Sequence, residues 1–266
     1  TYQAIKRAPN AKQLIKQLPL YWGAQPFTSG PTYAGSIVMF LFVFGLLFVK
    51  SEIRVWILLA TILSLMLAWG KNFMPLTDFF LDYFPGYNKF RAVSMILIIA
   101  EFTLPLLGFV ALNKFINTDL DEKKKPLQLA FYIVGGITLV FTLMPSLFFN
   151  FVGAQDANLA KNGWPIDALQ SDRVALLSAD AWRSFIFISL AFTAMWLFLK
   201  NKISSRYVIL IIGLLILSDM WTVNKRYLND DNFARKNKVE VPYKATFADQ
   251  KILRDKDPNF RVFNQS

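Results

Sequence analysis

The sequence predicts an all-α, polytopic transmembrane helical bundle of about six spans. The chain of 266 residues is 55% hydrophobic and contains 26 Phe, which is too apolar for an ordinary soluble domain. A helix rises about 1.5 Å per residue, so about 20 apolar residues cross a hydrocarbon core about 30 Å thick. Six apolar segments approach that length, and Trp, Tyr, Lys and Arg flank them as interfacial anchors. They are residues 32–49, 53–69, 93–113, 127–150, 184–199 and 207–223.

These segments form the middle of three predicted parts. Residues 1–31 are polar, and we expect them to contain an amphipathic helix lying on the membrane surface. Residues 32–223 form the transmembrane domain. Residues 224–266 are polar again: Thr246 is expected to cap a short helix, and the alternation over residues 260–263 is typical of a first strand. We therefore expect this tail to begin a soluble domain of a longer protein.

The connections between the segments alternate between short and long. The short ones are dense in Lys and Arg, which by the positive-inside rule predicts that they are cytoplasmic. The long loops and both ends of the chain would then be extracytoplasmic. Lys225 and Arg226 directly follow the last segment and favour the opposite orientation, so charge alone leaves the question open.

Composition excludes several classes of function. The chain has no Cys and no His, which excludes disulfides, thiol nucleophiles, His-ligated zinc and Ser-His-Asp catalysis within it. No phosphate-binding glycine loop, dinucleotide fingerprint or metal-spaced cluster occurs, so the sequence requires no cofactor or metal. The formal net charge of +11 suits membrane lipid headgroups, because no motif typical of nucleic-acid binding is present.

The loop between the second and third segments is the richest candidate site. It combines the carboxylates of Asp78 and Asp82 with the cations of Lys71, Lys89 and Arg91. Cations beside a membrane suit a lipid phosphate, and the carboxylates suit a general base or a divalent cation. The structural alternative is an interfacial helix whose charged side chains extend into water. In either case Asp78 and Asp82 share one helical face at i, i+4.

Two acids occur inside apolar segments. Glu101 lies deep in the third segment, and Pro105 frees its backbone carbonyl, so we expect an inward-facing site for a ligand or a proton. The alternative is a Glu that fixes helix packing. Asp219 lies near the end of the last segment, where pairing with Lys225 or Arg226 is the favoured interpretation.

Three charged residues precede or begin the fifth segment. Asp180 is predicted to cap that helix, and Arg183 is predicted to anchor it at the interface. We therefore interpret Asp180, Arg183 and Arg173 as structural rather than catalytic residues.

Several short motifs together resemble one family. They are residues 21–31 (YWGAQPFTSGP), 69–72 (WGKN), 78–80 (DFF), 87–91 (YNKFR) and 219–229 (DMWTVNKRYLN). As a set they resemble the YfhO family of bacterial membrane proteins, especially its Bacteroidetes members, over almost the whole chain.

The resemblance implies a relation to the GT-C membrane glycosyltransferases. Such enzymes transfer a sugar from a polyprenyl-phosphate carrier to a cell-envelope acceptor, at the outer face of the bacterial cytoplasmic (inner) membrane. Their catalytic Asp usually lies in the first outward loop, which we expect to precede this chain. Asp78 and Asp82 would then assist, while Lys71, Lys89 and Arg91 would hold the carrier phosphate.

Two other functions stay open at this point. A lipid or glycolipid transporter would use Glu101 as its coupling group. A non-catalytic subunit would use its apolar faces to bind a larger membrane complex.

Overall fold

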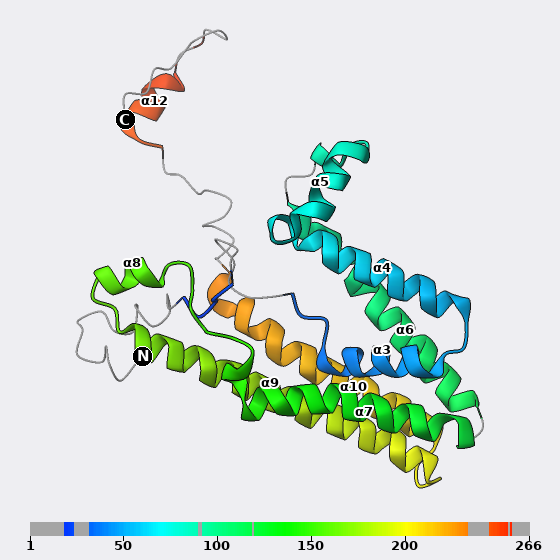
Figure 1. The fold of residues 1–266 in the computed structure, drawn as a ribbon. Helices are drawn as coiled ribbons and strands as arrows, with labels where there is room; N and C mark the ends of the chain where they lie inside the picture. The colour runs from blue at the N-terminus through cyan, green and yellow to red at the C-terminus, as the bar shows by residue number, and fades with distance from the viewer. Residues whose placement is uncertain are drawn as a thin grey trace. The chain divides into compact units, whose positions relative to one another are not determined.

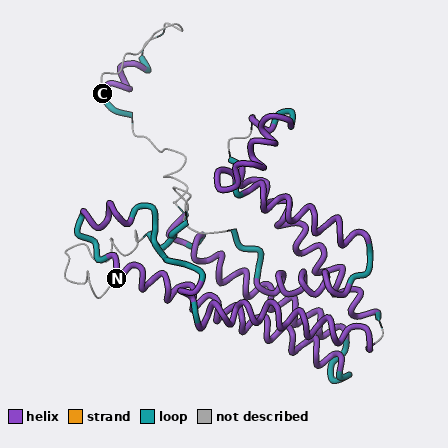
Figure 2. Tube along the Cα trace, viewed as in Figure 1, coloured by secondary structure: helices purple, strands orange, loops and turns teal. Residues whose placement is uncertain are grey.

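The structure is a computed structural model. It describes residues 19–23, 32–89, 92–118, 120–233, 245–254 and 256. Regular secondary structure in these residues is helical, and no strand occurs among them (Figure 2). The predicted all-α class is therefore confirmed. The chain divides into two units, Thr1–Val223 and Asn224–Ser266, and each is described by itself.

The first unit consists of α-helices, and 3₁₀ turns occur in the connections α4–α5, α5–α6 and α7–α8 (Figure 1). Its α-helices are α3 (Ser36–Phe48), α4 (Glu52–Ala68), α5 (Met74–Tyr83), α6 (Leu97–Asn117), α7 (Leu120–Leu143), α8 (Asp156–Lys161), α9 (Ile166–Leu199) and most of α10 (Ser205–Tyr227). The 3₁₀ turns are η1 (Gly70–Phe73), η2 (Tyr87–Lys89), η3 (Val93–Ile96) and η4 (Pro145–Leu147).

Helix α3 forms the centre of the core. It packs against α6, α7 and α9, and the side chains of Phe40 and Phe44 are fully buried. A Cβ at Gly45 would lie 2.8 Å from Cγ of Leu107 on α6, and one at Gly108 would lie 3.0 Å from Cβ of Leu41. One glycine on each helix thus permits the close approach of α3 and α6.

Helix α4 packs along α6, and hydroxyl groups form hydrogen bonds within this contact. The Thr61 and Thr103 hydroxyls are 2.7 Å apart, and the Ser64 hydroxyl donates a 2.7 Å hydrogen bond to the Ile96 carbonyl. Hydroxyls at a helix contact satisfy each other where no water is available. After Ala68 the chain turns by 109° into the segment that contains η1 and α5.

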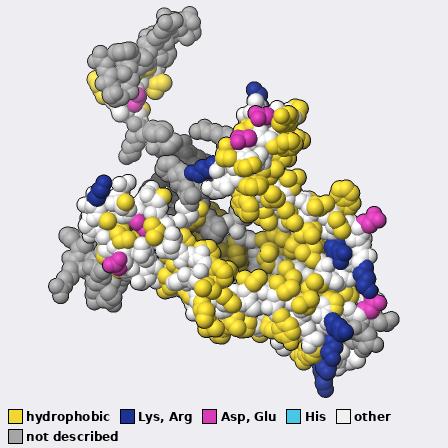
Figure 3. Space-filling model, viewed as in Figure 1, with side chains coloured by type: hydrophobic (Ala, Val, Ile, Leu, Met, Phe, Trp, Pro, Cys, Tyr) yellow, Lys and Arg dark blue, Asp and Glu magenta, His cyan; other side chains and the backbone are white. Residues whose placement is uncertain are grey.

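Helix α9 lies against α7, and aromatic rings join them. Phe131 and Phe192 stack with their centroids 4.3 Å apart. At the short-loop end, the buried Lys123 donates a 2.8 Å hydrogen bond to the Phe115 carbonyl and lies over the Phe115 and Phe198 rings. Figure 3 shows Lys and Arg gathered at this end, beside a largely hydrophobic flank.

Four described helices are long and apolar enough to cross a membrane, and the bent pair of α4 with η1 and α5 would be a fifth. The four are Val93–Asn117, Glu122–Leu143, Ile166–Leu199 and Ser205–Tyr227. These helices support a multi-pass membrane protein, with four or five candidate spans where the sequence predicts about six. Helix α3 has 13 residues, a length of about 20 Å, which suits a helix buried within the bundle rather than a complete span.

The fifth predicted segment is also corrected. Helix α9 has 34 residues and begins at Ile166, far before the predicted start at residue 184. Asp180 therefore lies within the helix and does not cap it. The sequence suggested a break because Arg173, Asp180 and Arg183 interrupt the apolar pattern, whereas the structure places two of these groups against partners from other segments.

The second unit contains the end of α10, the turn η5 (Asp230–Asn232) and helix α12 (Phe247–Ile252). Thr246 accepts a hydrogen bond from the Asp249 amide, and the Asp249 carboxylate accepts one from the Thr246 amide. The predicted cap at Thr246 is confirmed as a reciprocal capping box. The strand expected over residues 260–263 and the surface helix expected before Pro19 lie outside the described residues.

Candidate functional site

The residues of the predicted loop site lie on and beside helix α5. Lys71 belongs to η1, Asp78 and Asp82 lie one turn apart on α5, and Lys89 ends η2. All four side chains are exposed, and none forms an ion pair with another described residue. Arg91 lies outside the described residues. The structure thus places the four charges along one exposed segment without joining them in a shared cavity, and the described residues contain no group of three acids suited to a metal ion.

A row of aromatic rings accompanies these charges. Phe80 lies 5.4 Å from Phe84 and 5.5 Å from Tyr87, centroid to centroid, while Phe79 lies 5.3 Å from Tyr83. Thr77 does not cap α5: it is buried within the helix, and its hydroxyl donates a 2.9 Å hydrogen bond to the Gly70 carbonyl. This hydrogen bond stabilises the bend after α4. It thereby places α5 and its aromatic side chains at the end of the bundle.

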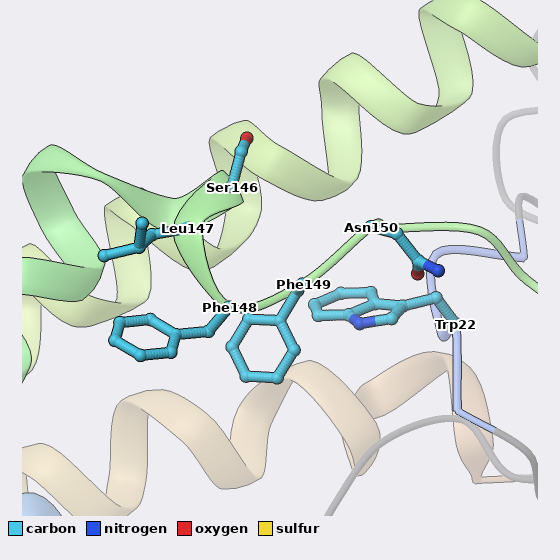
Figure 4. Close-up of a pocket in the computed structure, with 6 residues that line it drawn as sticks. All are labelled: Trp22, Ser146, Leu147, Phe148, Phe149 and Asn150. Carbon is cyan, nitrogen blue, oxygen red and sulfur yellow. The ribbon is translucent and has the colours of Figure 1, made fainter.

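Two open, adjoining hollows lie at the end of α7 and the start of α9. The first, of about 450 Å³, is lined by Trp22 and residues 146–150 (Figure 4). In Figure 4 the Trp22 indole lies beside the Phe149 ring, with the Asn150 amide next to it. The second, of about 500 Å³, shares Phe149 and Asn150 and adds polar groups from α9. These α9 residues are Asp167, Gln170 and Ser171.

A buried ion pair beside these hollows fixes their walls. Arg173 on α9 is 1% exposed, and its two terminal nitrogens donate to the two carboxylate oxygens of Asp156 at 2.7 and 2.9 Å. The same nitrogens donate to the backbone carbonyls of Phe151 and Pro19, each at 2.8 Å. One guanidinium thus satisfies three acceptor groups from two separate segments, which is the geometry for which Arg is suited.

We call the bonded pair of Arg173 and Asp156 the clamp, and the backbone around Asp156 is adapted to it. The Gly153 amide donates a 2.8 Å hydrogen bond to the Asp156 carboxylate, and a Cβ at Gly153 would lie 2.9 Å from a terminal nitrogen of Arg173. The hydrogen bond from Arg173 is the main reason that the pKa of Asp156 lies below its ordinary value. Trp22 contacts Phe151 with ring centroids 5.1 Å apart, so the clamp holds both walls of the first hollow.

A second polar cluster lies farther along α9, where α3 begins. The buried carboxylate of Asp219 accepts hydrogen bonds from the Tyr33 hydroxyl at 2.8 Å and from the Ser36 amide and hydroxyl at 2.9 and 2.8 Å. Arg183 lies 3.4 Å from the same carboxylate and donates to the Tyr33 oxygen at 3.2 Å.

Both intramembrane acids differ from their predicted roles. Asp219 pairs with Arg183 and with groups at the start of α3, so the favoured pairing with Lys225 or Arg226 is wrong. Glu101 is exposed on the outside of α6, so the expected inward-facing site is also wrong. The reason for the second error is that hydrophobic periodicity in α6 is weak, and the sequence alone does not indicate which face packs on α3.

Sequence reasoning missed the residues that build the hollows and their clamp. Trp22 and Asn150 come from loops and Asp156 begins α8, and the sequence indicated a structural role for Arg173 alone. The available signal was local: Gly153 stands three residues before Asp156, and both residue types are typical of turns. Comparison with known proteins adds no assignment, because no family model, curated protein or solved structure matches this chain.

Proposed function

We propose that this chain is the membrane domain of a protein that binds a lipid-linked sugar. In the full-length protein, the sugar would pass from a polyprenyl-phosphate carrier to a cell-envelope acceptor. The observation that carries the proposal is the hollow beside Trp22, which combines the indole and the Phe149 ring with the Asn150 amide. Aromatic faces pack against the C–H face of a sugar ring, while amides and carboxylates bond to its hydroxyls.

The adjoining hollow extends the same chemistry. Asp167 and Gln170 contribute a carboxylate and a second amide within about 500 Å³, a size suited to a small ligand. The clamp of Arg173 and Asp156 lies beside this hollow and holds its wall in place. A binding wall that is fixed before the ligand arrives loses less conformational freedom on binding.

The carrier phosphate is assigned to the cations beside α5. Lys71 and Lys89 are exposed at the end of the bundle where α4 ends and α6 begins, and Lys is a suitable point charge for a phosphate. Asp78 and Asp82 on the same segment are the candidates for binding sugar hydroxyls or acting as a base. The motif resemblance to the YfhO family and its GT-C relatives supports this division of roles.

The transporter alternative loses its main support. A coupling carboxylate must face an internal path that alternates between the two sides of the membrane, whereas Glu101 faces outward from α6. The alternative of a subunit in a larger membrane complex is compatible with that outward position.

The proposal is tested by identifying the lipid that co-purifies with the full-length protein. We expect mass spectrometry of the extracted lipid to find an isoprenoid phosphate, both bare and carrying a sugar. Lys71→Ala combined with Lys89→Ala should remove both forms. Asn150→Ala combined with Asp167→Ala should reduce the sugar-carrying form and retain the bare carrier.

Matched variants control for general damage. Asn158→Ala and Lys161→Ala alter the same residue types on exposed positions of α8, and they should leave both lipid forms unchanged. Recovery of bulk phospholipid alone, with no isoprenoid phosphate, overturns the proposed function.

A further inference from the structure

One stripe of helix α6 is apolar except for a single acid. Ile98, Phe102 and Phe109 are 70%, 66% and 52% exposed, and their spacing of four and seven residues places them on one helical face. Glu101 lies at the edge of this stripe and is also exposed. We call these four residues the α6 stripe.

Glu101 lies at a depth where water is absent. The span Val93–Asn117 contains 25 residues, a length of about 37 Å, and Glu101 is about 12 Å from its Val93 end. With a hydrocarbon core about 30 Å thick centred on this span, the backbone of Glu101 is about 8 Å inside the apolar region. A Glu side chain is too short to reach the interface from there, and an ionisable group that faces lipid is strongly disfavoured.

No described residue satisfies this group. Neither a hydrogen bond nor an ion pair from the described part of the chain reaches the Glu101 carboxylate. Pro105 also removes the usual intrahelical donor to the Glu101 carbonyl, because its ring nitrogen carries no hydrogen.

We propose that the α6 stripe is the docking surface for a membrane-spanning helix of a partner protein, and that this helix places a Lys or Arg against Glu101. A cation with several N–H donors satisfies both the carboxylate and the free carbonyl. The exposed Ile98, Phe102 and Phe109 supply the apolar contact on either side. A lipid tail matches these apolar side chains but offers no donor to Glu101.

A second copy of this chain does not fit the same surface. Away from the ends of the four unbent spans, the basic residues are Arg173 and Arg183, while Lys71 lies at the bend of the fifth candidate span. Arg173 is bound to Asp156, and Arg183 is bound to Asp219. A symmetric contact through the α6 stripe would set two Glu101 carboxylates together without a cation, so charge favours a different protein.

The test is site-specific cross-linking of the full-length protein in its own membrane. Phe102→p-benzoylphenylalanine places a photoreactive ketone in the α6 stripe. We expect it to cross-link one membrane-spanning segment that carries a Lys or Arg within the hydrocarbon region. Adding Glu101→Gln should lower the yield about tenfold, in line with the loss of a strong interhelical hydrogen bond.

A charge exchange makes the result specific. Glu101→Lys should abolish the cross-link, and replacing the partner's basic residue by Glu should restore it. The control is Leu217→p-benzoylphenylalanine, at a site on α10 that is 67% exposed, which should cross-link lipid alone. The thermal midpoint of the purified Glu101→Gln protein should match that of the wild type, because the side chain has no described partner within the chain.

Three outcomes overturn the proposal. One is cross-linking from Phe102 to lipid only. Another is a cross-link to a second copy or another part of this chain. The third is a yield that does not change with Glu101→Gln.

Discussion

Asp219 caps the first turn of a helix that begins 183 residues earlier in the chain. Its carboxylate accepts hydrogen bonds from both the amide and the hydroxyl of Ser36, and α3 has no side-chain cap of its own from the preceding Gly35. A carboxylate at a helix N-terminus satisfies a free amide and opposes the positive end of the helix dipole. A residue of α10 thus fixes the start of α3, the central helix of the core.

The cap predicts a graded response to substitution. Asp219→Leu removes the buried carboxylate that lies nearest to Arg183 and the closer acceptor of the Ser36 amide, so we expect the free energy of unfolding to fall by about 3–5 kcal/mol. Asp219→Asn retains one acceptor oxygen and should cost less. Reversible unfolding in mixed micelles measures both values.

Tyr33→Phe is the matched control for that series. It removes one hydroxyl donor to Asp219 and a weaker acceptor of the Ser36 amide and Arg183, and it leaves both Ser36 bonds to Asp219 in place, so we expect a loss of about 1 kcal/mol. An Asp219→Leu protein as stable as Tyr33→Phe would show that the cap contributes little.

The Arg173–Asp156 clamp predicts an effect on both stability and loop order. Arg173→Leu leaves a buried carboxylate unpaired and should lower the free energy of unfolding by about 3–5 kcal/mol. Arg173→Lys should also be damaging, because an ammonium does not reproduce the two parallel bonds to Asp156. Limited proteolysis should then cut the loop at residues 148–155 faster than in the wild type.

An exposed pair supplies the comparison for the clamp. Lys50 and Glu122 lie 3.7 Å apart with most of each side chain in solvent, so Glu122→Gln should change stability by less than about 1 kcal/mol. Equal effects of Glu122→Gln and Arg173→Leu would contradict the assigned role of burial.

The clamp also predicts how the loop responds to acid. Arg173 holds the pKa of Asp156 below its ordinary value of 3.8, so its contribution to stability is present above that value. It is lost as the pH falls through the lower pKa of the folded state. Trp22 contacts the loop, so its fluorescence should stay constant down to about pH 4 and change below it.

Substitution of the carboxylate checks the origin of that transition. Asp156→Asn removes the titrating group, so the acid-dependent change in Trp22 fluorescence should disappear. A transition at the same pH in the Asn variant would assign it to a different group.

Parts of this fold follow directly from the sequence. The third and sixth apolar segments correspond closely to α6 and α10 because their apolar runs are continuous and charged residues bound them. The start of α9 was not predictable, because Arg173, Asp180 and Arg183 break its apolar pattern. Their partners lie on other segments: Asp156 precedes α9, and Asp219 lies on α10.

The candidate site was less accessible to sequence reasoning. Residues 70–89 form one continuous segment, so their charges and aromatic rings were recognised together. The two adjoining hollows instead join residues from separate parts of the chain, and no local spacing relates Trp22, Asn150 and Asp167. Similarly, the outward position of Glu101 depends on how α6 packs against α3 and α4, which weak periodicity does not specify.

The orientation of the bundle is testable because the chain has no Cys. Helix α9 alone separates Asn162 from Lys202, and both side chains are exposed. If α9 spans the membrane with the basic short loops inside, a membrane-impermeant maleimide should label Asn162→Cys in intact cells. It should label Lys202→Cys only after permeabilisation, and Ala194→Cys, which is buried in α9, should resist labelling in both conditions. Labelling of Lys202→Cys alone in intact cells would reverse the orientation, and equal labelling of both exposed sites would show that α9 does not cross the membrane.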